Sequence, residues 1–91
     1  MKQLPDNVSP YKRTPEFNQQ TVPQGLLHEH KTKESVWGKI VVLEGQLQYT
    51  IHEPNQEVII LDINRHGIVE PTMRHQVKPL GHVRFYVEFN R

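Results

Sequence analysis

The chain has 91 residues, of which 35% are hydrophobic and 23% charged, and its formal net charge is +1. This length predicts one domain spanning residues 1–91. Acids and bases are mixed along the chain, which argues against a nucleic-acid partner, and no apolar run is long enough for a membrane-spanning helix. The lack of cysteine excludes disulfides and zinc–thiolate sites, and the lack of a signal-peptide pattern predicts a cytoplasmic protein.

The N-terminal part of the chain is rich in proline. Proline fixes φ and has no backbone N–H, so it interrupts helices and interior strands. The pattern predicts an extended N-terminal arm over residues 1–15, followed by a short edge strand near residues 16–20. Phe17 is the aromatic residue available to pin this arm to the body of the protein.

From residue 25 onwards the pattern indicates short strands. A first strand is predicted over residues 26–31 and a β-branched, apolar one over residues 37–43, with a polar turn at 31–35 between them. Gly45 closes a predicted turn, because glycine tolerates a positive φ. Residues 46–52 then alternate between apolar and polar side chains, which is typical of a half-buried antiparallel strand.

The C-terminal half continues in the same way. Residues 58–61 form an apolar strand after a turn at 53–56, and further turns are predicted at 64–67 and 79–81. The last segment, 82–90, alternates with four apolar residues facing inward: Val83, Phe85, Val87 and Phe89. Short strands separated by glycine and proline turns predict an all-β sandwich or barrel.

Three histidines suggest a metal site. His28 and His30 lie two apart on a predicted strand, so both side chains would share the face of Leu26. His75 follows a proline turn and would come from a distant strand. Neutral imidazole binds divalent zinc, iron and nickel, so these residues predict a transition-metal site. Glu34 is a candidate fourth ligand. The alternatives are an exposed strand edge for the histidines and a solvated turn for Glu34.

The chain resembles the small cupins, and more specifically the YeaR/TehB-like domain of tellurite-resistance proteins. The residues that carry the resemblance are 14–18, 22–30, 37–45 and 69–75. The resemblance implies a cupin-type double-stranded β-helix (jelly-roll) barrel, often paired as a homodimer, with His28, His30 and His75 as metal ligands. The glutamate of the cupin pattern falls on Gly38 when counted back from Gly45, and on Glu34 when counted forward from His30.

Three functions follow as hypotheses. The first is a stand-alone metal-binding cupin, associated with resistance to tellurite or oxidative stress, whose metal binds a small oxyanion or oxygen ligand. The second is a metal-dependent enzyme of the oxygenase or isomerase type, by analogy with the fold. The third is a metal-free ligand-binding or interaction module. Some tellurite-resistance proteins carry a similar domain before a methyltransferase, and methyl transfer is not carried over to this chain.

Overall fold

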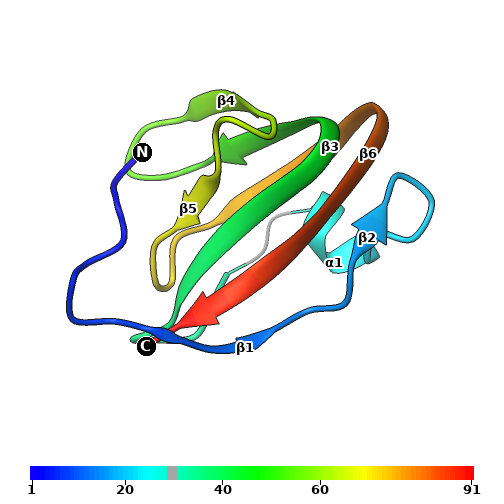
Figure 1. Cartoon of the computed structure of the whole chain (residues 1–91). Coiled ribbons are helices and arrows are strands. Elements are labelled where there is room, and N and C mark those ends of the chain that lie inside the picture. Colours follow the sequence, from blue (N-terminus) through cyan, green and yellow to red (C-terminus); the bar gives the residue numbers. More distant parts are fainter. Residues whose placement is uncertain (29–30) are drawn as a thin grey trace.

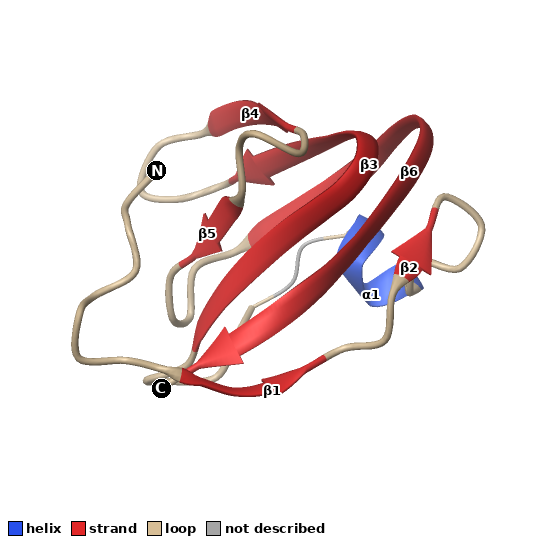
Figure 2. Cartoon of the chain, in the orientation of Figure 1, coloured by secondary structure: helices blue, strands red, loops and turns tan. Residues whose placement is uncertain are grey.

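Strands make up almost all of the regular secondary structure. The computed structural model describes residues 1–28 and 31–91. The elements in chain order are β1 (Pro10–Arg13), β2 (Phe17–Asn18), α1 (Gln24–Leu27), β3 (Trp37–Ile51), β4 (Glu57–Leu61), β5 (Gly67–Val69) and β6 (His75–Asn90) (Figures 1 and 2). Every strand pair is antiparallel, which confirms the predicted all-β class. In the described ranges no helix has both the length and the apolar character needed to cross a membrane.

Two long strands, β3 and β6, organise the fold. They pair antiparallel from Trp37 opposite Asn90 to Ile51 opposite His75. The strand order is β1-β6-β3-β4, with β2 paired to β6 and β5 paired to β3. Figure 1 shows the two long strands running side by side and curving together, so that the shorter elements lie around one pair. This pairing joins the middle of the chain to its C-terminal end.

The turns predicted at 44–45 and 79–81 are wrong, because both segments lie inside the long strands. The register between β3 and β6 shifts around Gly45, as in a β-bulge. Gly45 has a φ of +77°, and a Cβ atom there would lie 1.9 Å from the backbone oxygen of His82. The glycine thus permits close backbone approach and a bend within a continuous strand, where the sequence pattern suggested a reversal.

The core lies on the inner face of the bent sheet. The predicted alternation is confirmed: Leu47, Tyr49 and Ile51 are buried on β3. Val83, Phe85 and Val87 are buried on β6, and Phe89 packs against this cluster partly buried. These side chains share one face because successive residues of a strand point to opposite sides.

The N-terminal arm is attached along β6. β2 falls inside the predicted edge strand at 16–20 and places Phe17 opposite Phe85. The two rings make an edge-to-face contact with centroids 5.7 Å apart, which confirms Phe17 as the anchor of the arm. β1, which the sequence analysis did not predict, pairs with the end of β6.

The strand predicted over residues 26–31 is wrong where the structure describes it, because Leu26 and Leu27 end the helix α1. Pro23 precedes this helix with a φ of −61°, and its carbonyl accepts a hydrogen bond of 3.0 Å from the Leu26 N–H. The single turn packs against β6 and directs Leu26 towards the core. His28 follows the helix in an extended conformation.

Candidate ligand site at His75

His75 is the buried polar residue around which a site can be built. It is the first residue of β6, and only 4% of its surface is exposed. A tight turn leads into it: the Met73 N–H contacts the Glu70 carbonyl at 3.4 Å, and Thr72 has a φ of 62°. This turn delivers His75 to the start of β6 with its imidazole buried.

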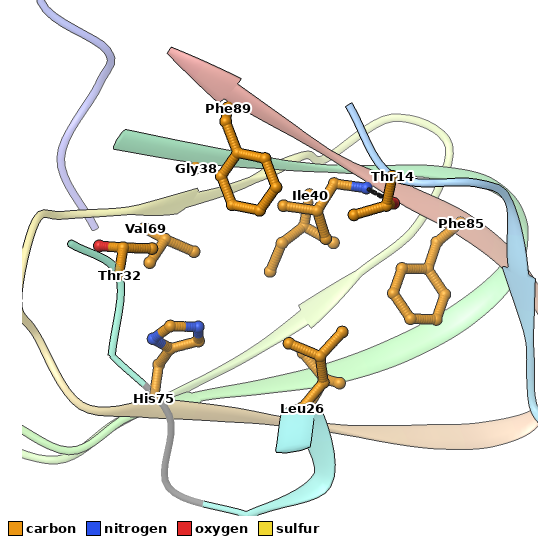
Figure 3. Close-up of a pocket in the computed structure, with 11 residues that line it drawn as sticks. Thr14, Leu26, Thr32, Gly38, Ile40, Val69, His75, Phe85 and Phe89 are labelled. Atoms are coloured by element: carbon orange, nitrogen blue, oxygen red, sulfur yellow. Dashed lines mark hydrogen bonds between the residues drawn. The ribbon is translucent and has the colours of Figure 1, made fainter. Parts of the chain in front are cut away.

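The His75 ring points into a small cavity of about 40 Å³. Figure 3 shows the imidazole directed into the space between Val69, Ile40 and Leu26, with Phe85 and Phe89 on the other sides. Apart from His75, Thr14 and Thr32, the lining is apolar: Leu26, Gly38, Ile40, Val69, Val77, Phe85, Val87 and Phe89. A small, mostly apolar cavity with an imidazole in its wall suits a ligand of a few atoms held at a fixed point.

A backbone hydrogen bond sets the tautomer of His75. Its Nδ1 lies 3.1 Å from the carbonyl oxygen of Met73. A carbonyl can only accept, so Nδ1 carries the proton and donates it. In the neutral ring Nε2 then has the lone pair. Metal-binding histidines are commonly oriented in this way, with one ring nitrogen donating to a backbone carbonyl and the other coordinating.

Tyr49 supports the imidazole but is not suited to acid–base chemistry. Its ring meets that of His75 edge to face, with centroids 6.0 Å apart. Its hydroxyl donates a 2.8 Å hydrogen bond to the Ile68 carbonyl. Burial, reinforced by the negative charges of Glu70 and Glu57, raises the pKa of the Tyr49 phenol well above its ordinary value. The phenol therefore stays protonated and acts as a packing group and donor.

The described structure does not bring His28 and Glu34 into a metal-binding group with His75. His28 is exposed after α1, and Glu34 is exposed in the turn before β3. In residues 1–28 and 31–91 no three His, Cys, Asp or Glu side chains gather closely enough to hold a metal ion, so His28, Glu34 and His75 do not form such a group. His30 lies outside the described residues. The metal site remains a prediction.

Sequence reasoning did not identify several residues of the cavity wall. Leu26 reaches the cavity from a helix and not from the predicted strand. Thr32 lies in a polar segment that carried no signal of its own. Its hydroxyl donates to the Glu70 carbonyl at 3.2 Å, and its carbonyl accepts from the Thr72 N–H at 3.2 Å. These two bonds fix the segment after residue 31 to the turn that precedes His75.

A separate surface cluster surrounds Arg84. Its guanidinium bonds the carboxylates of Glu16 and Glu44, and Glu44 also lies 2.7 Å from His82 Nε2. Hydrogen bonds from Arg84 and then His82 lower the pKa of Glu44, and the bonds to Glu16 and Glu44 raise that of Arg84. The cluster ties the arm to β3 and β6 on an exposed surface, where each pair contributes little stability.

The fold and the cavity define a small antiparallel β domain in which the buried His75 faces a cavity of about 40 Å³. The family model of the TehB-like domain matches residues 12–87. The chain therefore belongs to the TehB-like domain family, as the sequence resemblance indicated.

Individual relatives agree with this assignment. The chain is 34% identical over 75 residues to the "Probable S-adenosyl-L-methionine-dependent methyltransferase TehB" of Haemophilus influenzae (strain ATCC 51907 / DSM 11121 / KW20 / Rd). That match covers 78% of this chain and 26% of the relative, so the chain corresponds to about a quarter of that protein. It is 27% identical over 89 residues to the "Uncharacterized protein YeaR" of Escherichia coli (strain K12), covering 88% of this chain and 74% of the relative.

Solved structures show the same fold. A crystal structure of a protein from E. coli (strain K12) superimposes with a TM-score of 0.88 at 24% identity, covering 100% of this chain and 97% of that one. The crystal structure of TehB from H. influenzae superimposes with a TM-score of 0.83 at 27% identity, covering 93% of this chain and 32% of that one. The bent β3–β6 pair is thus part of a fold that occurs in experimental structures.

Proposed function

We propose that this TehB-like domain is a cupin-type barrel that binds a divalent transition metal, zinc, iron or nickel, beside the cavity at His75. His75 would coordinate through Nε2, together with His28 and His30, and Glu34 is the candidate fourth ligand. The observation that supports the proposal is the hydrogen bond from His75 Nδ1 to the Met73 carbonyl, because it fixes the orientation of a buried imidazole, as in many metal-binding histidines.

The ligand in this proposal is a small oxyanion or other oxygen donor. The cavity of about 40 Å³ has room only for a group of a few atoms, and its walls are mainly apolar. A metal bound there would act as a Lewis acid towards that oxygen. The apolar walls would exclude bulk water, which strengthens electrostatic interactions within the site.

Elemental analysis by mass spectrometry tests the metal directly. We expect near-stoichiometric metal in the purified protein, and its loss in His28→Ala, His30→Ala and His75→Gln. His82→Ala is the matched control, because His82 is exposed on β6 and bonds Glu44 away from the cavity lining. Circular dichroism would verify that each variant is folded. A parent protein that contains no metal, even after reconstitution, would contradict the proposal.

A metal-free ligand-binding module is the second candidate. It is favoured by the apolar cavity lining and by the absence of a three-donor group among the described side chains. In that case His75 would serve as a hydrogen-bond acceptor for a small polar ligand. Ligand binding would then survive treatment with a chelator, whereas a metal-dependent site would lose it.

The homodimer is also a proposal and is independent of the metal. A chain of this size has a small core, so pairing with a second copy would bury additional surface. Light scattering coupled to size-exclusion chromatography measures the mass in solution. A mass of about 21 kDa would be twice the 10.7 kDa of one chain and would support the dimer, whereas 10.7 kDa would refute it.

A further inference from the structure

A second hollow lies next to the His75 cavity. This lysine groove has a volume of about 180 Å³ and is lined by Tyr11, Lys12, Lys31, Thr32, Lys33, Val36 and Phe89. Thr32 and Phe89 also line the His75 cavity, so the two spaces share a wall. Three of the seven described residues that line it are lysines, and two of these lie in the segment 31–35 that the sequence predicted as a polar turn.

The charge of the lysine groove is not compensated by carboxylates. In residues 1–28 and 31–91, no acidic side chain lines the groove, and Lys12, Lys31 and Lys33 make no ion pair. Other cations do have such partners: Lys2 lies 3.3 Å from Glu70, for example. The groove is therefore a place where positive charge is collected without an internal counter-charge.

Charged groups close to the groove affect its positive charge. The guanidinium of Arg91 stacks on the Tyr11 ring, 4.0 Å from its centroid, and adds a cation at the rim. Among the described residues, Glu34 follows Lys33 in the chain and Glu88 pairs with Arg13 in the β1–β6 register. Neither carboxylate is part of the lining, whereas three lysines are.

The backbone that carries the lysines is held in place. The hydrogen bonds of Thr32 to Glu70 and Thr72 fix the centre of the Lys31–Lys33 segment. The Val36 N–H donates to the Lys33 carbonyl at 3.1 Å, which closes the turn before β3. Lys12 lies on β1 opposite Phe89 of β6. Lysines from two separate elements are thus positioned on a formed wall, which reduces the ordering cost of binding.

We propose that the lysine groove binds a small, multiply charged oxyanion through Lys12, Lys31 and Lys33. Ammonium groups donate charge-assisted hydrogen bonds to such oxygens, and three of them suit a tetrahedral or pyramidal anion. The volume of the groove matches a small molecule. The inference deepens the proposed function, because it places the anion beside the His75 cavity, but the lysines themselves require no metal.

Titration with inorganic phosphate, followed by amide NMR on the metal-free full-length chain, tests this site. We expect shifts at the amides of residues 31–36 and Lys12. Lys31→Gln/Lys33→Gln should weaken phosphate binding by about tenfold or more, since two charge-assisted contacts are lost. Raising the salt concentration should also weaken it, because ionic screening reduces interactions of exposed charges. All three groove lysines are exposed, so the variant should remain folded.

Lys39→Gln/Lys78→Gln is the matched control, because it removes the same net charge from residues that do not line the groove. It should leave phosphate affinity within about twofold of the parent, because neither residue supplies a contact in the groove. Equal weakening in the two double variants, or no phosphate binding by the parent, would overturn the inference.

The same variants separate this inference from the metal proposal. Phosphate binding that persists in a metal-free His75→Gln protein would support the groove even if no metal is ever found. Retention of metal in Lys31→Gln/Lys33→Gln together with unchanged phosphate affinity would refute the groove and leave the metal site standing.

Discussion

Replacing Gly45 with alanine should destabilise the protein strongly, because the bend of β3 depends on it. Gly45 has a φ of +77°, which costs an L-residue about 1–2 kcal/mol. The new Cβ would also lie 1.9 Å from the His82 carbonyl oxygen, 2.9 Å from its carbon and 3.1 Å from the Val83 Cα. Because these are backbone atoms, the strands must shift, and overpacking of this kind costs roughly a further 1–3 kcal/mol.

The total expected cost is about 3 kcal/mol or more, and urea denaturation followed by circular dichroism measures it. With a slope of roughly 1–1.5 kcal/mol per molar urea for a domain of this size, the midpoint should fall by about 2 M or more. A folded Gly45→Ala protein with an unchanged midpoint would refute the close approach of β3 and β6 at this position.

Two other glycines serve as controls within the same chain. Gly81 has a φ of +82°, but nothing lies within 4 Å of an added Cβ. Gly81→Ala should therefore lower the free energy of unfolding only by the cost of a positive φ, about 1–2 kcal/mol. Gly25 lies in α1 with open space around it and no positive φ, so Gly25→Ala should be neutral or stabilising by up to about 1 kcal/mol. If Gly45→Ala and Gly81→Ala lower the free energy of unfolding equally, the strain of a positive φ alone explains the destabilisation at Gly45.

Two further predictions concern single contacts. Tyr49→Phe removes the hydrogen bond to the Ile68 carbonyl and should lower the free energy of unfolding by about 1–2 kcal/mol, measured by urea denaturation; no change would indicate that water replaces the hydroxyl. Hydrogen bonds from Arg84 and His82 lower the pKa of Glu44, so its stabilising contribution is present above the ordinary carboxyl pKa and is lost as pH falls through the lowered value. The stability difference between the parent and Glu44→Gln should therefore shrink as pH drops from 7 to 3, and a constant difference would contradict this assignment.

The sequence predicted the strands best where one face is buried. The alternation of Val83, Phe85 and Val87 is visible because each inward residue contacts the core, so the period of two is directly encoded. The sequence did not distinguish a bend within a strand from a reversal of the chain. Gly45 gives the same local signal in a turn and in a bulge, and only pairing with the distant strand β6 decides between them.

The sequence predicted the part of the site that has a local signal. The proline turn before His75 indicated a histidine at a strand start, and the structure places it there, buried. The segment at Leu26 is too short for its period to distinguish a helical turn from a strand. The lysine groove joins residues from β1 and the segment before β3, so only the tertiary fold brings Lys12 and Lys33 to one hollow.

The central claim is that His75 presents Nε2 to a metal ion, and crystallographic anomalous scattering at the absorption edge of a bound zinc or nickel ion tests it most directly. The account predicts an anomalous peak about 2.0–2.1 Å from His75 Nε2, the usual zinc–imidazole distance, with Nδ1 still donating to the Met73 carbonyl. A peak on Nδ1, or no peak near His75 in metal-saturated crystals, would contradict it.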